Sequence, residues 1–164
     1  MFVGFIAVVV ILLVIVGLMS SGGNQTQDGA RYITEAKKVK TVTHLMSGEA
    51  KFYYVRNETF LGLTMDYFKD TEFAAEKFVP TSNMSSDDWS GWPTADGGFP
   101  DPYTGGYIKV GGPAGDDLRI IATSINDGKN LAIYLVKRKD NNIDPTYLQI
   151  LEKTLASDPN FVGS

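Results

Sequence analysis

The first nineteen positions of the chain are all apolar or glycine, and the hydrophobic pattern changes character only after them. A helix over residues 1–19 would span roughly 28 Å, close to the ~30 Å thickness of the hydrocarbon core of a bilayer. Because no polar face interrupts the run, such a helix would be buried on every side. The pattern leaves three environments open: a membrane, the core of a domain, or the packed centre of a helical assembly.

Residues 20–28 are rich in side chains that weaken helices. Gly22 and Gly23 each cost about 1 kcal/mol relative to Ala, and the adjacent Ser20 and Ser21 compete for backbone hydrogen bonds. We expect residues 1–28 to form an apolar helix followed by a flexible joint, with a plain linker after a membrane anchor as the open alternative. Since no charged leader precedes the apolar run, we expect the chain to be a processed form.

A second helix is predicted over residues 30–56, because apolar residues recur there at steps of three and four. This buried stripe consists of Tyr32, Ala36, Val39, Val42 or Thr43, Met46, Ala50 and Tyr53. Acidic residues near the start and basic residues near the end suit the dipole of a helix. We therefore expect residues 29–164 to form one head domain that includes this amphipathic helix.

The remainder of the chain predicts a small sheet with short helices. Residues 65–78 have the spacing of a short amphipathic helix. Strand patterns occupy 106–112, 117–125 and 131–137, and Asp127-Gly128 between the last two predicts a hairpin.

A final helix is predicted to start at Pro145, capped by Asp144, and to run to about Ala156. The expected fold class is α+β, with a long N-terminal helix packed on a small antiparallel sheet.

Composition removes several kinds of chemistry. Fifteen Lys and Arg against nineteen Asp and Glu give a formal net charge of -4, so the chain has no basic surplus for nucleic acid. There is no cysteine and His44 is the one histidine. Thiol nucleophiles and thiolate metal sites are therefore excluded, and with the one histidine inside a predicted helix no Ser-His-Asp set can be argued. We predict no catalytic residue, no metal ligand and no cofactor, with His44 solvated or packed on its helix.

Two loops remain as candidates for binding. Residues 140–144 copy the start of a calcium loop, but Pro145 stands where that loop needs glycine, which argues against calcium. Residues 87–107 combine paired acids, such as Asp87 and Asp88, with rings that can stack on a ligand. These rings are Trp89, Trp92, Phe99 and Tyr103.

Three short motifs follow the second helix in a characteristic order. "ETFLGLT" at 58–64 approximates a Y-x-G-L-T stretch, Val79-Pro80 ends the next segment, and "DPYTGGYIKV" from Asp101 leads into a strand. With the apolar start and the joint, this order resembles that of mature type IV pilins. Within that family it is most similar to the type IVb pilins of conjugative thin pili.

The resemblance implies a structural subunit of an extracellular pilus that serves adhesion, conjugation or a related task. A prepilin peptidase would remove a leader, and Met1 would be N-methylated. The subunit would wait in the inner membrane until the pilus assembly machinery adds it to a helical homo-oligomer. Ser20, Ser21, Gly22 and Gly23 would form the helix break. The filament core would be packed by Met1, Phe2, Val3, Phe5, Ile6, Val9, Leu12, Leu13 and Val16.

Two departures from the family are visible. Phe5 stands where these pilins usually have a glutamate, and the missing cysteines exclude their usual C-terminal disulfide. We expect packing of Tyr147, Leu151 and Phe161 to close that region instead. The alternative function is a membrane-anchored envelope binding domain with the aromatic and acidic loop 87–107 as its pocket. For an anchored enzyme, the third possibility, the sequence offers no site.

Overall fold

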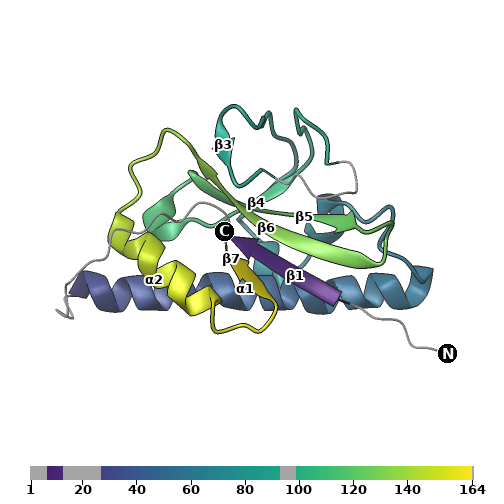
Figure 1. The fold of residues 1–164 in the computed structure, drawn as a ribbon, viewed down its shortest axis with the longest axis horizontal. Helices are drawn as coiled ribbons and strands as arrows, with labels where there is room; N and C mark the ends of the chain where they lie inside the picture. Colours follow the sequence, from purple (N-terminus) through teal and green to yellow (C-terminus); the bar gives the residue numbers. More distant parts are fainter. Residues whose placement is uncertain (1–6, 13–26, 93–98, 164) are drawn as a thin grey trace.

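The computed structural model describes residues 7–12, 27–92 and 99–163, and these form an α+β fold. The long helix α1 (Gln27–Asn57) runs along one side of the molecule, and a twisted sheet crosses it (Figure 1). The second helix, α2 (Pro145–Leu155), packs against α1. The predicted fold class of a long helix on a small antiparallel sheet is therefore confirmed at this level.

Five strands pair antiparallel and two add to them in parallel. The antiparallel strands are β2 (Phe78–Val79), β3 (Trp89–Ser90), β4 (Tyr107–Lys109), β5 (Leu118–Ile125) and β6 (Asn130–Arg138). The parallel additions are β1 (Ala7–Leu12) and β7 (Phe161–Gly163). The order across the sheet is β2-β4-β5-β6-β1-β7, and β3 pairs with the end of β6. The first strand of the chain thus lies next to the last hairpin.

Strand β1 corrects the prediction of a helix over residues 1–19. Ala7–Leu12 pair in parallel with β6, with Ala7 opposite Asn130 and Leu12 opposite Leu135. An unbroken apolar run does not separate a buried strand from a buried helix by periodicity. The Val and Ile in this run favour the extended form, and β6 offers the backbone partners. Residues 1–6 and 13–26, including the predicted joint, lie outside the described residues.

The amphipathic pattern of α1 is confirmed, with the helix starting three residues earlier than predicted. Its buried stripe is Ala36, Val39, Thr43, Met46 and Ala50. Thr43 is accommodated because its hydroxyl donates to the Lys40 carbonyl at 2.8 Å. The steps of three and four keep these residues on one face, which packs in the core with the sheet.

The prediction of a helix over residues 65–78 was wrong. The chain instead makes two 3-10 turns, η1 (Met65–Phe68) and η2 (Glu72–Ala74), and then β2. The amide and the hydroxyl of Thr71 both bond to the Phe68 carbonyl, at 3.1 and 2.6 Å. A local side-chain bond of this kind competes with helix propagation. Phe68 remains the fully buried anchor of the segment.

The predicted hairpin and capped helix are both confirmed. Asn126, Asp127 and Gly128 join β5 to β6 with positive φ angles of 53°, 57° and 82°. A Cβ on Gly128 would lie 2.7 Å from the Leu61 side chain, so close approach as well as φ requires glycine there. At the start of α2, the Asp144 carboxylate accepts from the Thr146 amide at 2.9 Å.

Candidate functional site: the outer face of the long helix

The face of α1 opposite its buried stripe carries apolar side chains that are exposed to solvent. Leu45, Phe52 and Val55 are 47%, 62% and 72% exposed. With Thr41 and Gly48 they follow alternating steps of four and three, so they form one line along the helix. We call Thr41, Leu45, Gly48, Phe52 and Val55 the outer stripe. Figure 1 shows α1 along one side of the molecule, with the sheet lying on one side of this helix only.

Gly48 lies in the middle of the outer stripe without an internal reason for being glycine. A Cβ at this position would meet none of the described atoms within 4 Å. Glycine inside a helix costs about 1 kcal/mol relative to alanine. Between Leu45 and Phe52, Gly48 leaves a shallow depression in the helix surface, where the backbone of another helix can approach closely. The stripe therefore has the shape of a helix-packing surface.

A groove of about 520 Å³ adjoins the stripe between α1 and η2. Lys37, Lys38 and Lys77 contribute cations to its lining, and Leu45 belongs to both the groove and the outer stripe. Lys38 is paired with Glu35 at 2.9 Å. The apolar outer face is thus bordered on one side by these lysines together with Glu72.

The residues predicted for filament packing fall into two groups. Val9 and Leu12 lie in strand β1, paired with β6. The remaining members, Met1, Phe2, Val3, Phe5, Ile6, Leu13 and Val16, lie outside the described residues, as do Ser20, Ser21, Gly22 and Gly23. Sequence analysis did not single out the outer stripe. Its signal was present, since Leu45, Phe52 and Val55 are apolar positions off the buried face.

The rings of the aromatic loop pack mainly on one another. Trp92 and Phe99 lie edge to face with centres 5.4 Å apart, and Phe99 stacks on Tyr103 at 4.9 Å. The Tyr103 hydroxyl donates to the Gly106 carbonyl at 2.5 Å. Burial raises the pKa of Tyr103 to about 12. The described rings therefore hold the loop together.

Trp89, the fourth ring, is buried beside two arginines. The guanidinium carbon of Arg119 lies 4.4 Å from the centre of Trp89 and 3.9 Å from that of Tyr107. Arg138 lies over Trp89 at 4.5 Å. Arg119 also donates two hydrogen bonds to Asp116, at 3.1 and 2.7 Å. These contacts join β3, β4, β5 and β6 and leave Trp89 closed to ligands.

His44 contacts the turn that follows α2. Its Nε2 lies 2.6 Å from an Asp158 oxygen, and the other Asp158 oxygen accepts from the Asn160 amide at 2.8 Å. Burial alone would raise the pKa of Asp158, but the Asn160 amide and His44 together hold it below its usual value. The carboxylate thus fastens the start of the C-terminal segment to α1.

The lowered pKa of Asp158 predicts a pH-dependent contribution to stability. Asp158→Asn should lower the free energy of unfolding by about 1 kcal/mol at pH 7. Because the folded pKa lies below the unfolded one, this contribution is present above pH ~4 and disappears as pH falls through the folded pKa. Urea unfolding of both proteins at pH 7 and at pH 2.5 measures it. A difference that stays constant between the two pH values would contradict the prediction.

The acidic stretch 140–144 uses its last carboxylate for structure. One Asp144 oxygen caps α2 and the other accepts from the Tyr32 hydroxyl at 2.8 Å. The Thr146 amide and the Tyr32 hydroxyl lower the pKa of Asp144. Within residues 7–12, 27–92 and 99–163, no three His, Asp or Glu side chains are grouped to hold a metal ion.

Comparisons of the whole chain with protein-family models, curated proteins and solved structures find no match. In the part of the chain that the structure describes, no helix is long and apolar enough to cross a membrane.

Proposed function

We propose that this chain is the structural subunit of an extracellular filament of the type IV pilus kind. The observation that carries the proposal is the outer stripe: an apolar line on the longest helix, with an unexplained glycine at its centre. The resemblance in element order supports it from the sequence side. In this proposal the subunit resides in the inner membrane before assembly, and a prepilin peptidase and the assembly machinery act on it.

Burial of the stripe would favour polymerisation. Burying a fully exposed side chain of the size of Phe or Leu contributes roughly 1.5–3 kcal/mol, and a half-exposed one contributes about half of that. Leu45, Phe52 and Val55 are all exposed in the single subunit, so each can be buried further when subunits pack together. If the surface that meets the stripe lies elsewhere on the next copy, the contact repeats without closing and produces a helical filament. The apolar residues 1–19 would pack in the same filament core.

Phe52→Asp should abolish filaments while leaving the subunit folded. Phe52 is 62% exposed in the single chain, so a carboxylate there stays hydrated. In a filament the same carboxylate would be buried without a partner, at a cost of several kcal/mol for every subunit. The measurement is the amount of full-length chain in sheared, detergent-free surface filaments, with circular dichroism of the purified chain as the folding check.

Asn142→Asp is the matched control, because it adds the same charge at an exposed loop position. Filaments should persist in this variant. Normal filament yield from Phe52→Asp would show that the outer stripe is not buried when subunits assemble. Wild-type chain found only in the membrane fraction would reject the filament function and favour an anchored domain.

A further inference from the structure

Strand β1 is inserted between two other strands. Along Ala7–Leu12 it pairs in parallel with Asn130–Leu135 of β6. On its other side Val10–Leu12 pair in parallel with Phe161–Gly163 of β7. We call the space between these parts of β6 and β7 the strand slot. Figure 1 shows β1 beside β6, with β7 next to it.

The slot is occupied by a segment that the rest of the sheet does not need. β2, β4, β5, β6 and β3 are joined by antiparallel pairs of their own. Removing β1 would break only its pairs with β6 and β7. Within the described part of the sheet, Ala7–Leu12 can therefore leave, and β7 with it, while the pairing of the five antiparallel strands stays intact.

An empty slot would be costly in water. Asn130–Leu135 of β6 would expose a row of unpaired backbone groups, and Leu131–Leu135 are buried residues of the core. β7 would lose β1, its strand partner among the described residues. The segment 7–12 would itself lose its strand partners. Occupation of the slot thus provides pairing partners for the backbone groups of both β6 and β1.

We propose that the strand slot holds Ala7–Leu12 of the same chain while the subunit is in neither a membrane nor a filament, and releases this segment when the subunit enters either of them. The inference rests on the proposed function, since Val9 and Leu12 belong to the residues assigned to filament packing. The same segment then pairs with β6 and β7 in one state and packs in the filament core in the other, and the two states exclude each other. Occupation of the slot is an autoinhibitory contact, because it withholds Ala7–Leu12 from the filament core.

The occupant is the chain's own segment because the observed register places all six residues against one uninterrupted stretch of β6. Release would also free β7, since Phe161–Gly163 pair with the same strand. Assembly should therefore loosen the C-terminal strand, while β5 and β6 keep their eight-residue pairing from Leu118 opposite Lys137 to Ile125 opposite Asn130.

A disulfide lock tests the proposal, because the chain contains no native cysteine. Val9→Cys is combined with Ala132→Cys, its partner across β1 and β6. The control combines Val9→Cys with Thr123→Cys, which faces Ala132 from β5 and so lies one strand further away. Neighbouring strands are about 4.8 Å apart, and a disulfide cannot bridge the roughly 9.6 Å across two spacings.

The purified full-length chains are oxidised without detergent and examined on non-reducing gels and by mass. We expect an intramolecular disulfide in the Val9/Ala132 pair, formed at least about tenfold faster than in the Val9/Thr123 control. Equal rates of disulfide formation in the two pairs, or no cross-link in the Val9/Ala132 pair, would overturn the occupation of the slot by Ala7–Leu12. Disulfide-linked dimers would overturn occupation by the same chain and indicate exchange of the strand between copies.

The same variants are then expressed in cells that assemble the wild-type chain. Locked Val9/Ala132 subunits should give at least a tenfold lower filament yield, and a reductant should restore it. Locked subunits that polymerise normally would overturn the release step. Failure of the wild-type chain to form filaments would reject the proposed function instead, while cross-linking of the purified chain would still decide whether the slot is occupied.

Discussion

Leu151→Ala is expected to lower the free energy of unfolding by about 2–5 kcal/mol, and adding Tyr147→Ala should bring the chain close to its unfolding threshold. Both side chains are fully buried, on the face of α2 that packs against α1. Tyr147 also stacks on Tyr32 of α1, with ring centres 5.4 Å apart. Each truncation removes apolar contacts and leaves a cavity that the helices cannot close without moving.

The measurement is thermal and urea unfolding followed by circular dichroism. At roughly 2–4 °C per kcal/mol for a chain of this size, Leu151→Ala should lower the midpoint by about 10 °C. An unchanged midpoint in the double variant would reject the packing of α2 as the closure of the C-terminal region.

Tyr147→Phe is the matched control for this prediction. Burial raises the pKa of Tyr147 to about 12, and its hydroxyl has no hydrogen-bond partner among the described residues. Removing an unpaired buried hydroxyl while keeping the ring should leave stability unchanged or raise it slightly. A loss comparable to that of the alanine variant would show that the hydroxyl, rather than the ring, carries the contribution of Tyr147.

Arg119→Ala should cost about 3 kcal/mol, the second large effect. The Arg119 side chain is only 9% exposed and lies between the rings of Trp89 and Tyr107. Two ring contacts, each worth roughly 0.5–2 kcal/mol, and a two-point bond to Asp116 are lost together. The Asp116 side chain is 49% exposed and regains water, which limits the penalty. Urea unfolding monitored by Trp fluorescence measures the loss.

Two variants separate stacking from charge. Arg119→Lys keeps the charge but lacks the planar group that stacks and bonds at two points, so it should recover little of the lost stability. Arg138→Ala should cost less than Arg119→Ala, because Arg138 is 35% exposed and contacts one ring, Trp89, rather than two. Full rescue by lysine would contradict the stacking explanation and leave charge alone as the contribution of Arg119.

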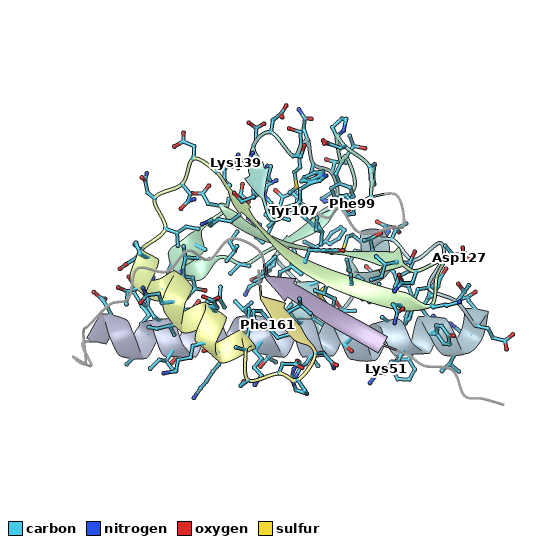
Figure 2. All side chains as sticks on the ribbon, in the orientation of Figure 1. Lys51, Phe99, Tyr107, Asp127, Lys139 and Phe161 are labelled. Carbon is cyan, nitrogen blue, oxygen red and sulfur yellow. The ribbon has the colours of Figure 1, made fainter. Side chains whose placement is uncertain are left out.

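These two clusters lie at different places in the head. The contacts of Tyr147 and Leu151 hold α2 on α1, and the Arg119 cluster ties the aromatic loop to the sheet, on the side of the molecule away from α1 where Figure 2 labels Tyr107 and Phe99. Neither involves the outer stripe. Weakening them should therefore reduce the amount of folded subunit, whereas Phe52→Asp should act on assembly alone.

Elements set by neighbouring residues could be predicted from the sequence. The period of apolar residues placed α1, Asp127-Gly128 placed the hairpin, and Asp144 followed by Pro145 placed the start of α2. Each of these signals acts within a few residues. The wrong prediction of a helix over 65–78 also has a local cause, because the Thr71 hydroxyl competes for the Phe68 carbonyl.

Features that depend on distant partners could not be predicted. The stacking of Arg119 between Trp89 and Tyr107 joins positions far apart in the chain. The outer stripe could be recognised only once the sheet had covered the opposite face of α1. For the candidate site, the sequence pointed to residues 1–16, whereas the structure adds an exposed line on α1 that the sequence analysis had not named.

The sequence by itself determined that this chain has an apolar start, an amphipathic long helix and an α+β head, because periodicity and turn chemistry act over short distances. Only the tertiary structure decided that Ala7–Leu12 form a strand, since a uniformly apolar run suits helix and strand alike and the edge of β6 supplies the partners. It also decided which apolar residues of α1 stay exposed, because burial depends on what packs against a helix.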